Sequence, residues 1–320
     1  MGKPNVDYNL YLIEILNWGI FMITVCLPGT GGMLPLPQRW LSCCWIEHQG
    51  GALLIDCGEG TQISLREAGC KLSHLKMVLI THFHADHVMG LPGLLLSLGN
   101  TGYTKSLCIA GPPGLEKLLS ALLVAAPLPF PLTVTELLPG DALPGWKGLT
   151  MTCRALDHGI PCYGWRVDVA RKPVFNLKKA KQLHIPQQYY RILHAGEAVT
   201  LEDGRLILPE QVLDGAREPI VVSYSTDTRP VKAVEELGRN AGLMIAEGLH
   251  GDNDQIEKAH KKGHMVFSEA ARLAQRAGAK RLWLTHYSPA LTDPQAVVTF
   301  AEEWFPGSVA AHDGIRLELG

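Results

Sequence analysis

Short apolar runs alternate with helical periodicities along most of the chain, which predicts a fold of alternating strands and helices. Apolar runs rich in β-branched residues, such as Met22–Leu27, Met77–Ile80 and Ile220–Tyr224, are typical of buried strands. The segments Thr61–Ala68 and Phe267–Ala277 have the period of amphipathic helices. This order favours a four-layer αββα sandwich, an α/β fold in which helices cover the outer faces of two mixed sheets.

The other predicted elements fit the same pattern. The glycines at positions 50 and 51 separate two apolar segments, Trp45–Glu47 and Ala52–Cys57, and predict a hairpin. We expect Leu132–Leu137 and Leu149–Ala155 to be strands that pair with each other. Further strands are expected at Leu107–Ala110, Leu243–Ala246 and Arg281–Leu284, and further helices at Leu91–Leu98 and Leu115–Ala125.

Composition narrows the class of protein. The chain has 320 residues, a formal net charge of −2, 47% hydrophobic and 19% charged residues, which is typical of a globular protein and excludes general disorder. Eight scattered cysteines without a Cys-x-x-Cys pair favour reduced thiols in a cytoplasmic protein. They also argue against a structural zinc ribbon.

We expect a single domain over residues 22–320, preceded by an extension of unknown role at residues 1–21. The apolar stretch Tyr8–Leu27 contains Glu14 and Asn17 and lacks a small-residue cleavage site. These features argue against a membrane anchor and against a secretory leader.

The densest cluster of chemically reactive side chains is the loop Thr81–His87, which directly follows the predicted strand Met77–Ile80. It contains His82, His84, Asp86 and His87. Imidazole nitrogens and carboxylate oxygens are the usual ligands of zinc and similar divalent metals. Three histidines and an aspartate in six residues therefore predict a metal site.

One loop supplies too few ligands for two metal ions, so further ligands must come from elsewhere. His158, Asp227 and His286 each follow a predicted strand, where open α/β folds expose functional loops. Any one of them alone could equally be a structural histidine or a turn-capping aspartate. Together with the loop, they predict a two-metal site of seven ligands.

These residues stand within motifs that resemble the metallo-β-lactamase superfamily and, within it, the ribonuclease Z family of tRNA 3′-processing enzymes. The resemblance runs from about Met22 to the C-terminus. The segments that carry it are 28–32 (PGTGG), 56–62 (DCGEGTQ), 81–87 (THFHADH), 90–93 (GLPG), 156–158 (LDH), 227–229 (DTR) and 285–289 (THYSP).

The resemblance implies a role for each site residue. His82, His84 and His158 would hold one zinc ion, and Asp86, His87 and His286 the other, with Asp227 bridging both. Asp86 would also act as general base or orient the attacking hydroxide. His264, paired with Glu247, would protonate the leaving ribose oxygen. Manganese or iron could occupy the same nitrogen and oxygen ligands.

A basic segment of the chain indicates that the protein binds RNA. Residues 166–196 carry seven lysines and arginines against a single acidic residue, Asp168. The segment resembles in position the protruding arm of ribonuclease Z, and we expect a basic arm at about residues 166–218. Its predicted RNA contacts are Lys178, Lys179, Lys181, Arg191, Tyr189 and Tyr190. The alternative is an ordinary solvated helix face.

The sequence departs from the family pattern in three places, and these affect the choice of substrate more than the hydrolytic chemistry. The arm has Ile185–Tyr190 where a Gly-Pro element is usual, Ala246 precedes Glu247 in place of a histidine, and Met265 replaces a small hydroxyl residue.

The sequence thus predicts a cytoplasmic zinc hydrolase, most simply an endoribonuclease that removes the 3′ trailer of precursor tRNA. The resemblance further implies a homodimer. The alternatives are a hydrolase of small phosphodiesters or other esters and, from another class, a non-catalytic RNA-binding protein with a decayed metal site.

Overall fold

The computed structural model describes residues 22–124 and 128–320, and these residues divide into two units. The larger unit comprises residues 22–168 and 221–319, and the smaller contains residues 169–220. The predicted extension at residues 1–21 lies outside the described residues. Among the described helices, none is long and apolar enough to cross a membrane.

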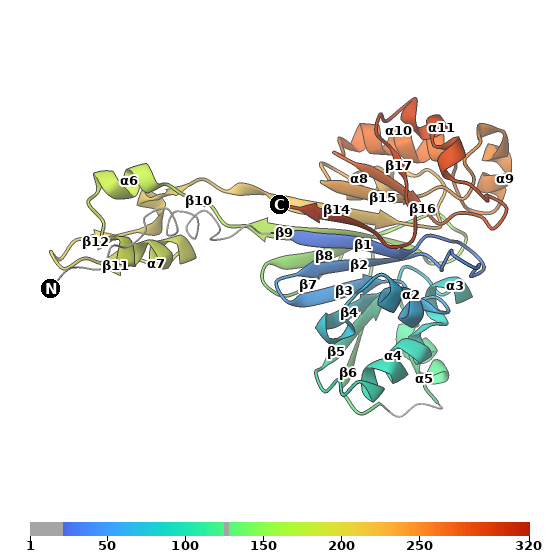
Figure 1. The fold of residues 1–320 in the computed structure, drawn as a ribbon, viewed down its shortest axis with the longest axis horizontal. Helices are drawn as coiled ribbons and strands as arrows, with labels where there is room; N and C mark the ends of the chain where they lie inside the picture. Colours follow the sequence, from blue (N-terminus) through green and yellow to red (C-terminus); the bar gives the residue numbers. More distant parts are fainter. Residues whose placement is uncertain (1–21, 125–127) are drawn as a thin grey trace. The chain divides into compact units, whose positions relative to one another are not determined.

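The larger unit is built on two mixed sheets (Figure 1). The first sheet is antiparallel from β18 to β3 and parallel from β3 to β6. Its described strands, in spatial order, are β18 (Ile315–Leu319), β1 (Ile23–Gly29), β2 (Cys43–His48), β3 (Gly51–Ile55), β4 (Leu75–Leu79), β5 (Leu107–Gly111) and β6 (Leu132–Glu136).

The second sheet has a parallel half, from β14 to β17, and an antiparallel hairpin of β7 and β8 at its other edge. Its described strands, in spatial order, are β17 (Val309–Ala310), β16 (Leu282–Thr285), β15 (Leu243–Glu247), β14 (Arg217–Ser225), β9 (Tyr163–Arg171), β8 (Leu149–Ala155) and β7 (Ala142–Pro144).

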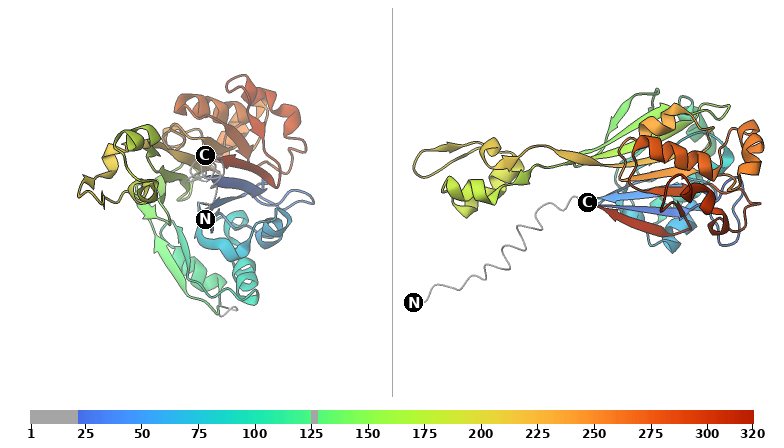
Figure 2. Two further views of the ribbon diagram at one scale, coloured as in Figure 1. Left: turned by 60° about the vertical axis from the view of Figure 1, so that its left-hand side comes forward. Right: turned by 90° about the horizontal axis from the view of Figure 1, so that it is seen from above.

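Helices cover the outer faces of both sheets, as the views in Figures 1 and 2 show. Leucines of α2, α4 and α5 pack against the first sheet, and apolar residues of α8, α10 and α11 pack against the second. Every residue of β3, β15 and β16 is buried, because these strands are covered on both faces. The helices are α2 (Thr61–Glu67), α3 (Ala85–Val88), α4 (Leu91–Asn100), α5 (Leu115–Leu122), α8 (Lys232–Leu237), α9 (Ile256–Lys261), α10 (Phe267–Ala277) and α11 (Thr299–Glu302).

The predicted αββα sandwich is confirmed, and one predicted strand pairing is wrong. Leu132–Leu137 and Leu149–Ala155 do form strands, β6 and β8, but they belong to different sheets. β8 instead pairs with the short strand β7, which the sequence analysis did not predict. The chain crosses from one sheet to the other between β6 and β7, and a tight hairpin then makes β7 the nearer partner.

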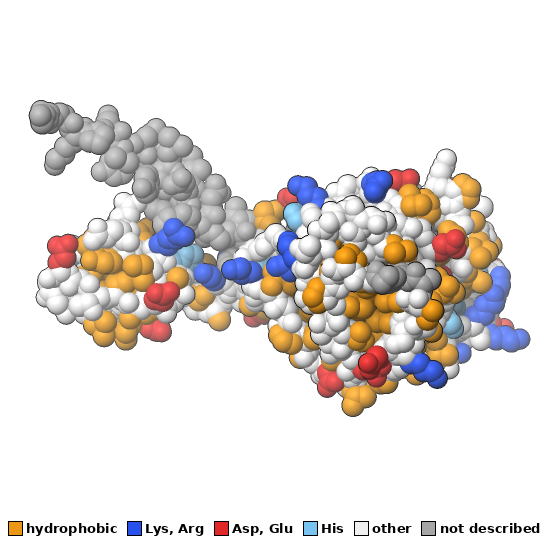
Figure 3. All heavy atoms as spheres, turned by 90° about the horizontal axis from the view of Figure 1, so that it is seen from below, with side chains coloured by type: hydrophobic (Ala, Val, Ile, Leu, Met, Phe, Trp, Pro, Cys, Tyr) orange, Lys and Arg blue, Asp and Glu red, His pale blue; other side chains and the backbone are white. Residues whose placement is uncertain are grey.

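The smaller unit has a hydrophobic core of its own, which includes Ala180, Ile185, Leu193 and Ile207. Its elements are β10 (Val174–Phe175) paired with β13 (Leu213–Asp214), β11 (Val199–Thr200) paired with β12 (Leu206–Ile207), and the helices α6 (Leu177–Gln182) and α7 (Tyr190–Ala195). Figure 3 shows apolar side chains gathered on one face of this unit, with basic side chains beside them.

Two glycines hold the histidine loop against the end of β3. The Gly90 N–H donates to the Cys57 carbonyl at 2.9 Å, and the Cys57 N–H donates to the His87 carbonyl at 2.8 Å. A Cβ atom on Gly90 would overlap the Gly58 carbonyl, and one on Gly58 would overlap the Asp86 carbonyl. Backbone therefore contacts backbone at this point, which only glycine permits.

We predict that Gly90→Ala lowers the free energy of unfolding by roughly 2–3 kcal/mol, because the added methyl group forces these two loops apart. Chemical denaturation would measure the loss. The control is Gly215→Ala, since a Cβ at Gly215 meets no atom within 4 Å. An equally small effect of both substitutions would contradict this account of the loop contact.

Candidate metal centre

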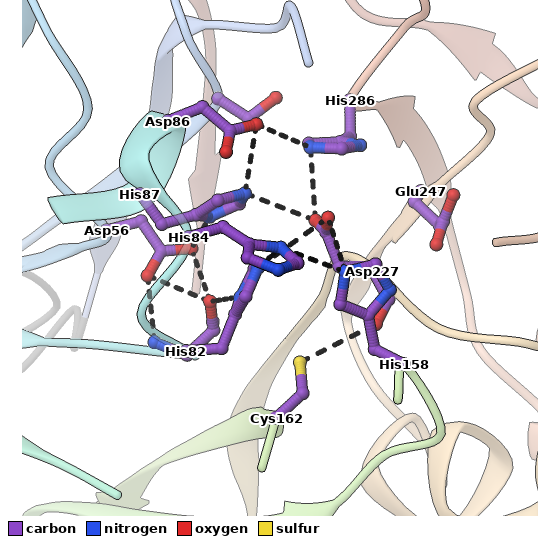
Figure 4. Close-up of polar contacts among 12 residues, drawn as sticks. Asp56, His82, His84, Asp86, His87, His158, Cys162, Asp227, Glu247 and His286 are labelled. Carbon is purple, nitrogen blue, oxygen red and sulfur yellow. Dashed lines mark hydrogen bonds and ion pairs between the residues drawn. The ribbon is translucent and has the colours of Figure 1, made fainter. Parts of the chain in front are cut away.

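The predicted ligands converge on one site in the larger unit (Figure 4). His82 and His84 lie between β4 and α3, and Asp86 and His87 lie within α3. The other three residues follow strand ends: His158 follows β8, Asp227 follows β14 and His286 follows β16. The site thus draws on both sheets.

One group of ligand atoms surrounds Oδ2 of Asp227. The Nδ1 atom of His84 lies 3.1 Å from Nε2 of His82 and 3.1 Å from Nε2 of His158. Oδ2 of Asp227 lies 3.7 Å from the same His82 nitrogen and 3.5 Å from the His158 nitrogen. The four atoms therefore face a common point.

A second group surrounds the other oxygen of Asp227. Oδ1 lies 3.2 Å from Nε2 of His87 and 3.0 Å from Nε2 of His286. Oδ2 of Asp86 lies 3.5 Å and 3.6 Å from the same two nitrogens. Asp227 thus presents one carboxylate oxygen to each group.

These spacings fit metal coordination. A tetrahedral zinc ion with bonds of about 2.0–2.1 Å has ligand atoms about 3.3 Å apart. Moreover, three of the facing atoms are buried and have no hydrogen-bond partner in the structure, namely Nε2 of His87, Nε2 of His286 and Oδ1 of Asp227. Buried polar atoms without a partner are rare, and a cation would satisfy all three.

The outer nitrogens of three histidines are fixed by hydrogen bonds that leave Nε2 free. Nδ1 of His87 lies 2.8 Å from Oδ2 of Asp56, and Nδ1 of His158 lies 2.9 Å from the Gly263 carbonyl. Thr81 donates its hydroxyl to Asp56, so that it can accept from Nδ1 of His82 at 3.0 Å. When each ring is neutral, these contacts favour the proton on Nδ1, which leaves the Nε2 lone pair for a metal ion.

Three residues of the site have positive φ angles: Asp56 (62°), Asp227 (47°) and His286 (59°). Each comes just after a strand, where the left-handed conformation turns the chain sharply. Such conformations cost a non-glycine residue roughly 1–2 kcal/mol and concentrate at functional sites. Gly32 makes room for the turn at His286, since a Cβ atom on Gly32 would lie 2.7 Å from the His286 ring.

Burial and charge set the protonation states. Burial lowers the pKa of His82 and His84, so both rings are neutral at pH 7. Burial opposes the charged forms of Asp86 and Asp227, but the neighbouring histidines outweigh it and hold both carboxyl pKa values well below the usual range. The two carboxylates thus remain ionised.

His264 and Glu247 form a buried pair beside the ligands. Nδ1 of His264 lies 3.1 Å from Oε1 of Glu247, and the His264 ring packs against His158 and His286 with centroid distances of 4.8 Å and 5.6 Å. Burial lowers the pKa of His264, but the Glu247 carboxylate outweighs this effect and raises it to about 9. His264 therefore holds a proton at neutral pH.

The six predicted RNA-contacting residues lie in the smaller unit and differ in exposure. Lys178, Lys181 and Arg191 are exposed, whereas Lys179 forms an ion pair with Asp214 at 2.9 Å. Tyr189 is half-buried and Tyr190 is buried in the small core. Of these four predicted cations, Lys178, Lys181 and Arg191 have no ion pair with a described carboxylate.

Two residues that shape the site, Asp56 and Met33, were not predicted from the sequence. Asp56 lies in the motif at residues 56–62, at the end of a predicted strand. A position at the end of a strand is the signal by which Asp227 was predicted, so Asp56 could have been found in the same way. Met33 donates its backbone N–H to Oδ2 of Asp86 at 2.8 Å. A backbone donor leaves no trace in the residue type, so no sequence signal could have shown that contact.

We predict that Asp56→Asn weakens zinc binding about 10–100-fold, because the amide cannot accept from Thr81 and His87 as the carboxylate does. Competition with a chromophoric chelator would measure the affinity. Asp141→Asn, a change at an exposed aspartate, serves as the control. Unaltered zinc affinity in Asp56→Asn would show that His87 needs no such orientation.

The chain is similar in sequence to known proteins. A family model described as "Anti-Pycsar protein Apyc1" matches residues 23–118, less than half of the chain. Ribonuclease Z of Lachnospira eligens is 42% identical over 299 residues, which span 93% of this chain and 98% of that protein.

Solved structures share the fold. The metallo-β-lactamase fold protein YhfI from Bacillus subtilis has a TM-score of 0.67 and 21% identity, with 93% of this chain and 99% of that chain covered. The short form of human tRNase Z has a TM-score of 0.66 and 25% identity, with 92% and 98% covered. The sandwich is thus a metallo-β-lactamase fold. Given the near-complete match to the Lachnospira eligens protein, the chain belongs to the ribonuclease Z family.

Proposed function

We propose that this protein is a cytoplasmic, dinuclear-zinc endoribonuclease that removes the 3′ trailer of precursor tRNA. The observation that carries the proposal is the placement of Asp227, whose two carboxylate oxygens each face a separate group of ligands. His82, His84 and His158 would hold one ion and Asp86, His87 and His286 the other, with Asp227 shared between them. We infer that precursor tRNA is the substrate because the chain belongs to the ribonuclease Z family.

Two ions held by these residues would supply a hydroxide nucleophile at neutral pH and neutralise charge on the phosphodiester. The protein's own task is to hold the ligands rigidly. Hydrogen bonds from Thr81 and His87 to Asp56, and from His158 to Gly263, fix the rings before substrate arrives. Such preorganisation avoids reorganisation during the reaction.

Asp86 is proposed to orient the attacking hydroxide. Its Oδ2 atom accepts from the Met33 N–H and faces Nε2 of both His87 and His286. The carboxylate is ionised, as its lowered pKa requires, and can accept the proton of a nucleophile. Its position between the two histidines keeps it aligned.

His264 is proposed to protonate the ribose oxygen that leaves. A ring nitrogen of His264 lies within 4.8 Å of ligand atoms of Asp227 and His286. Glu247 is fully buried and accepts from Nδ1, which leaves the other ring nitrogen for proton transfer. With its pKa raised to about 9, His264 enters the reaction protonated at pH 7.

RNA binding is proposed for the smaller unit. Its exposed cations, Lys178, Lys181 and Arg191, suit the phosphate backbone of a folded RNA. We further propose a homodimer in which the arm of one subunit holds RNA that the other subunit cleaves. The buried Tyr190 is better explained by the core of the arm than by stacking on a base.

The test is cleavage of a precursor tRNA that carries a 3′ trailer. We predict a single cut after the discriminator base and a loss on the order of 10²–10⁴-fold in Asp86→Ala, which removes the residue that orients the nucleophile. Glu303→Ala, a change at an exposed carboxylate, should cleave like the unaltered protein. Intact precursor tRNA together with hydrolysis of bis(p-nitrophenyl) phosphate would contradict the tRNA substrate.

A further inference from the structure

A pair of exposed lysines lies outside the arm, in the segment that precedes Gly263 and His264. Lys258 in α9 and Lys262 just after it are four residues apart and share one helix face. Lys258 donates to Oε1 of Gln255 at 3.2 Å. Among the described residues, neither lysine forms an ion pair with a carboxylate. Both charges are therefore available to an external anion.

The chain leads directly from Lys262 into the site. The carbonyl of the next residue, Gly263, is the partner of Nδ1 of His158. The residue after it, His264, packs against His158 and His286 and pairs with Glu247. Lys262 is thus two residues from the proposed proton donor.

His250 is influenced electrostatically by both lysines and by His264. Its side chain is largely buried, with 7% of the residue exposed, and its Nε2 atom has no hydrogen-bond partner in the structure. Burial lowers the pKa of His250, and the positive charges of Lys258, Lys262 and His264 lower it further. Both lysines thus lie close enough to His250 to act on its charge, and the ring is neutral and buried with an unpartnered Nε2 atom.

We propose that Lys258, Lys262 and the His250 ring form a subsite for a phosphate of the RNA next to the scissile one. The inference rests on the phosphodiesterase chemistry proposed above. His264 marks the side on which the ribose oxygen leaves. The nucleotide that carries this oxygen also carries a 5′-phosphate, so the subsite receives the phosphate on the 5′ side of the cut.

Three dinucleotides isolate this contact: UpU, pUpU with an added 5′-phosphate, and UpUp with an added 3′-phosphate. All contain the same scissile bond. We predict that the unaltered protein cleaves pUpU about five- to tenfold more efficiently than UpU, as expected of one charge-assisted contact to phosphate. This preference should disappear in the double variant Lys258→Gln/Lys262→Gln.

Two matched variants test the assignment. Lys262→Arg keeps the charge and should retain the preference for pUpU. Lys280→Gln changes an exposed lysine before β16, at the opposite end of that strand from His286, and should behave like the unaltered protein. The ratio of UpUp to UpU cleavage should be the same in the double variant as in the unaltered protein, since that phosphate lies on the other side of the cut.

Two results would overturn the subsite: equal cleavage of UpU and pUpU by the unaltered protein, or a pUpU preference that survives in the double variant. The dinucleotides contain no tRNA structure. Cleavage of dinucleotides but not of precursor tRNA would therefore reject the proposed substrate, while the comparison of lysine variants would still decide the subsite.

Discussion

Everything at this site depends on the Asp227 carboxylate, which is almost fully buried and faces four histidine nitrogens. Burying an ionised carboxylate away from water is costly unless opposite charge compensates it. Here each oxygen is directed at its own group of ligands, and one oxygen has no hydrogen-bond partner. This arrangement is the one expected of a set of ligands for cations.

The fold supplies the rigidity that such a set requires. Ligands come from the ends of strands in both sheets, and the residues behind them are locked by packing. The glycine contact between residues 58 and 90 sets the position of the histidine loop, and Asp56 sets the orientation of one of its rings. The left-handed residues at three strand ends store local strain, which the surrounding layers of packed helix and sheet can tolerate.

Sequence patterns predicted the architecture well wherever a local signal exists. The helix Phe267–Ala277 has the predicted bounds, because its apolar face is regular. The pairing of Leu132–Leu137 with Leu149–Ala155 was wrong, because apolar alternation identifies strands but does not specify their partners.

At the metal centre, too, features with a local sequence signal could be predicted and features without one could not. The seven predicted ligands could be identified by residue type and by their place after strands. The contact of the Met33 N–H with Asp86 could not, since backbone donors are common to every residue type. Nor could the burial of Tyr190, because an aromatic residue among lysines looks alike in sequence whether it contacts RNA or closes a small core.

The most direct test of the account is the metal content of the purified protein and of its Asp227→Ala variant, measured by inductively coupled plasma mass spectrometry after desalting. The account predicts two metal ions per chain in the unaltered protein. It predicts well below one ion per chain in the variant, with activity lost in parallel and the fold retained by circular dichroism. A variant that still holds two metal ions would contradict the bridging role of Asp227.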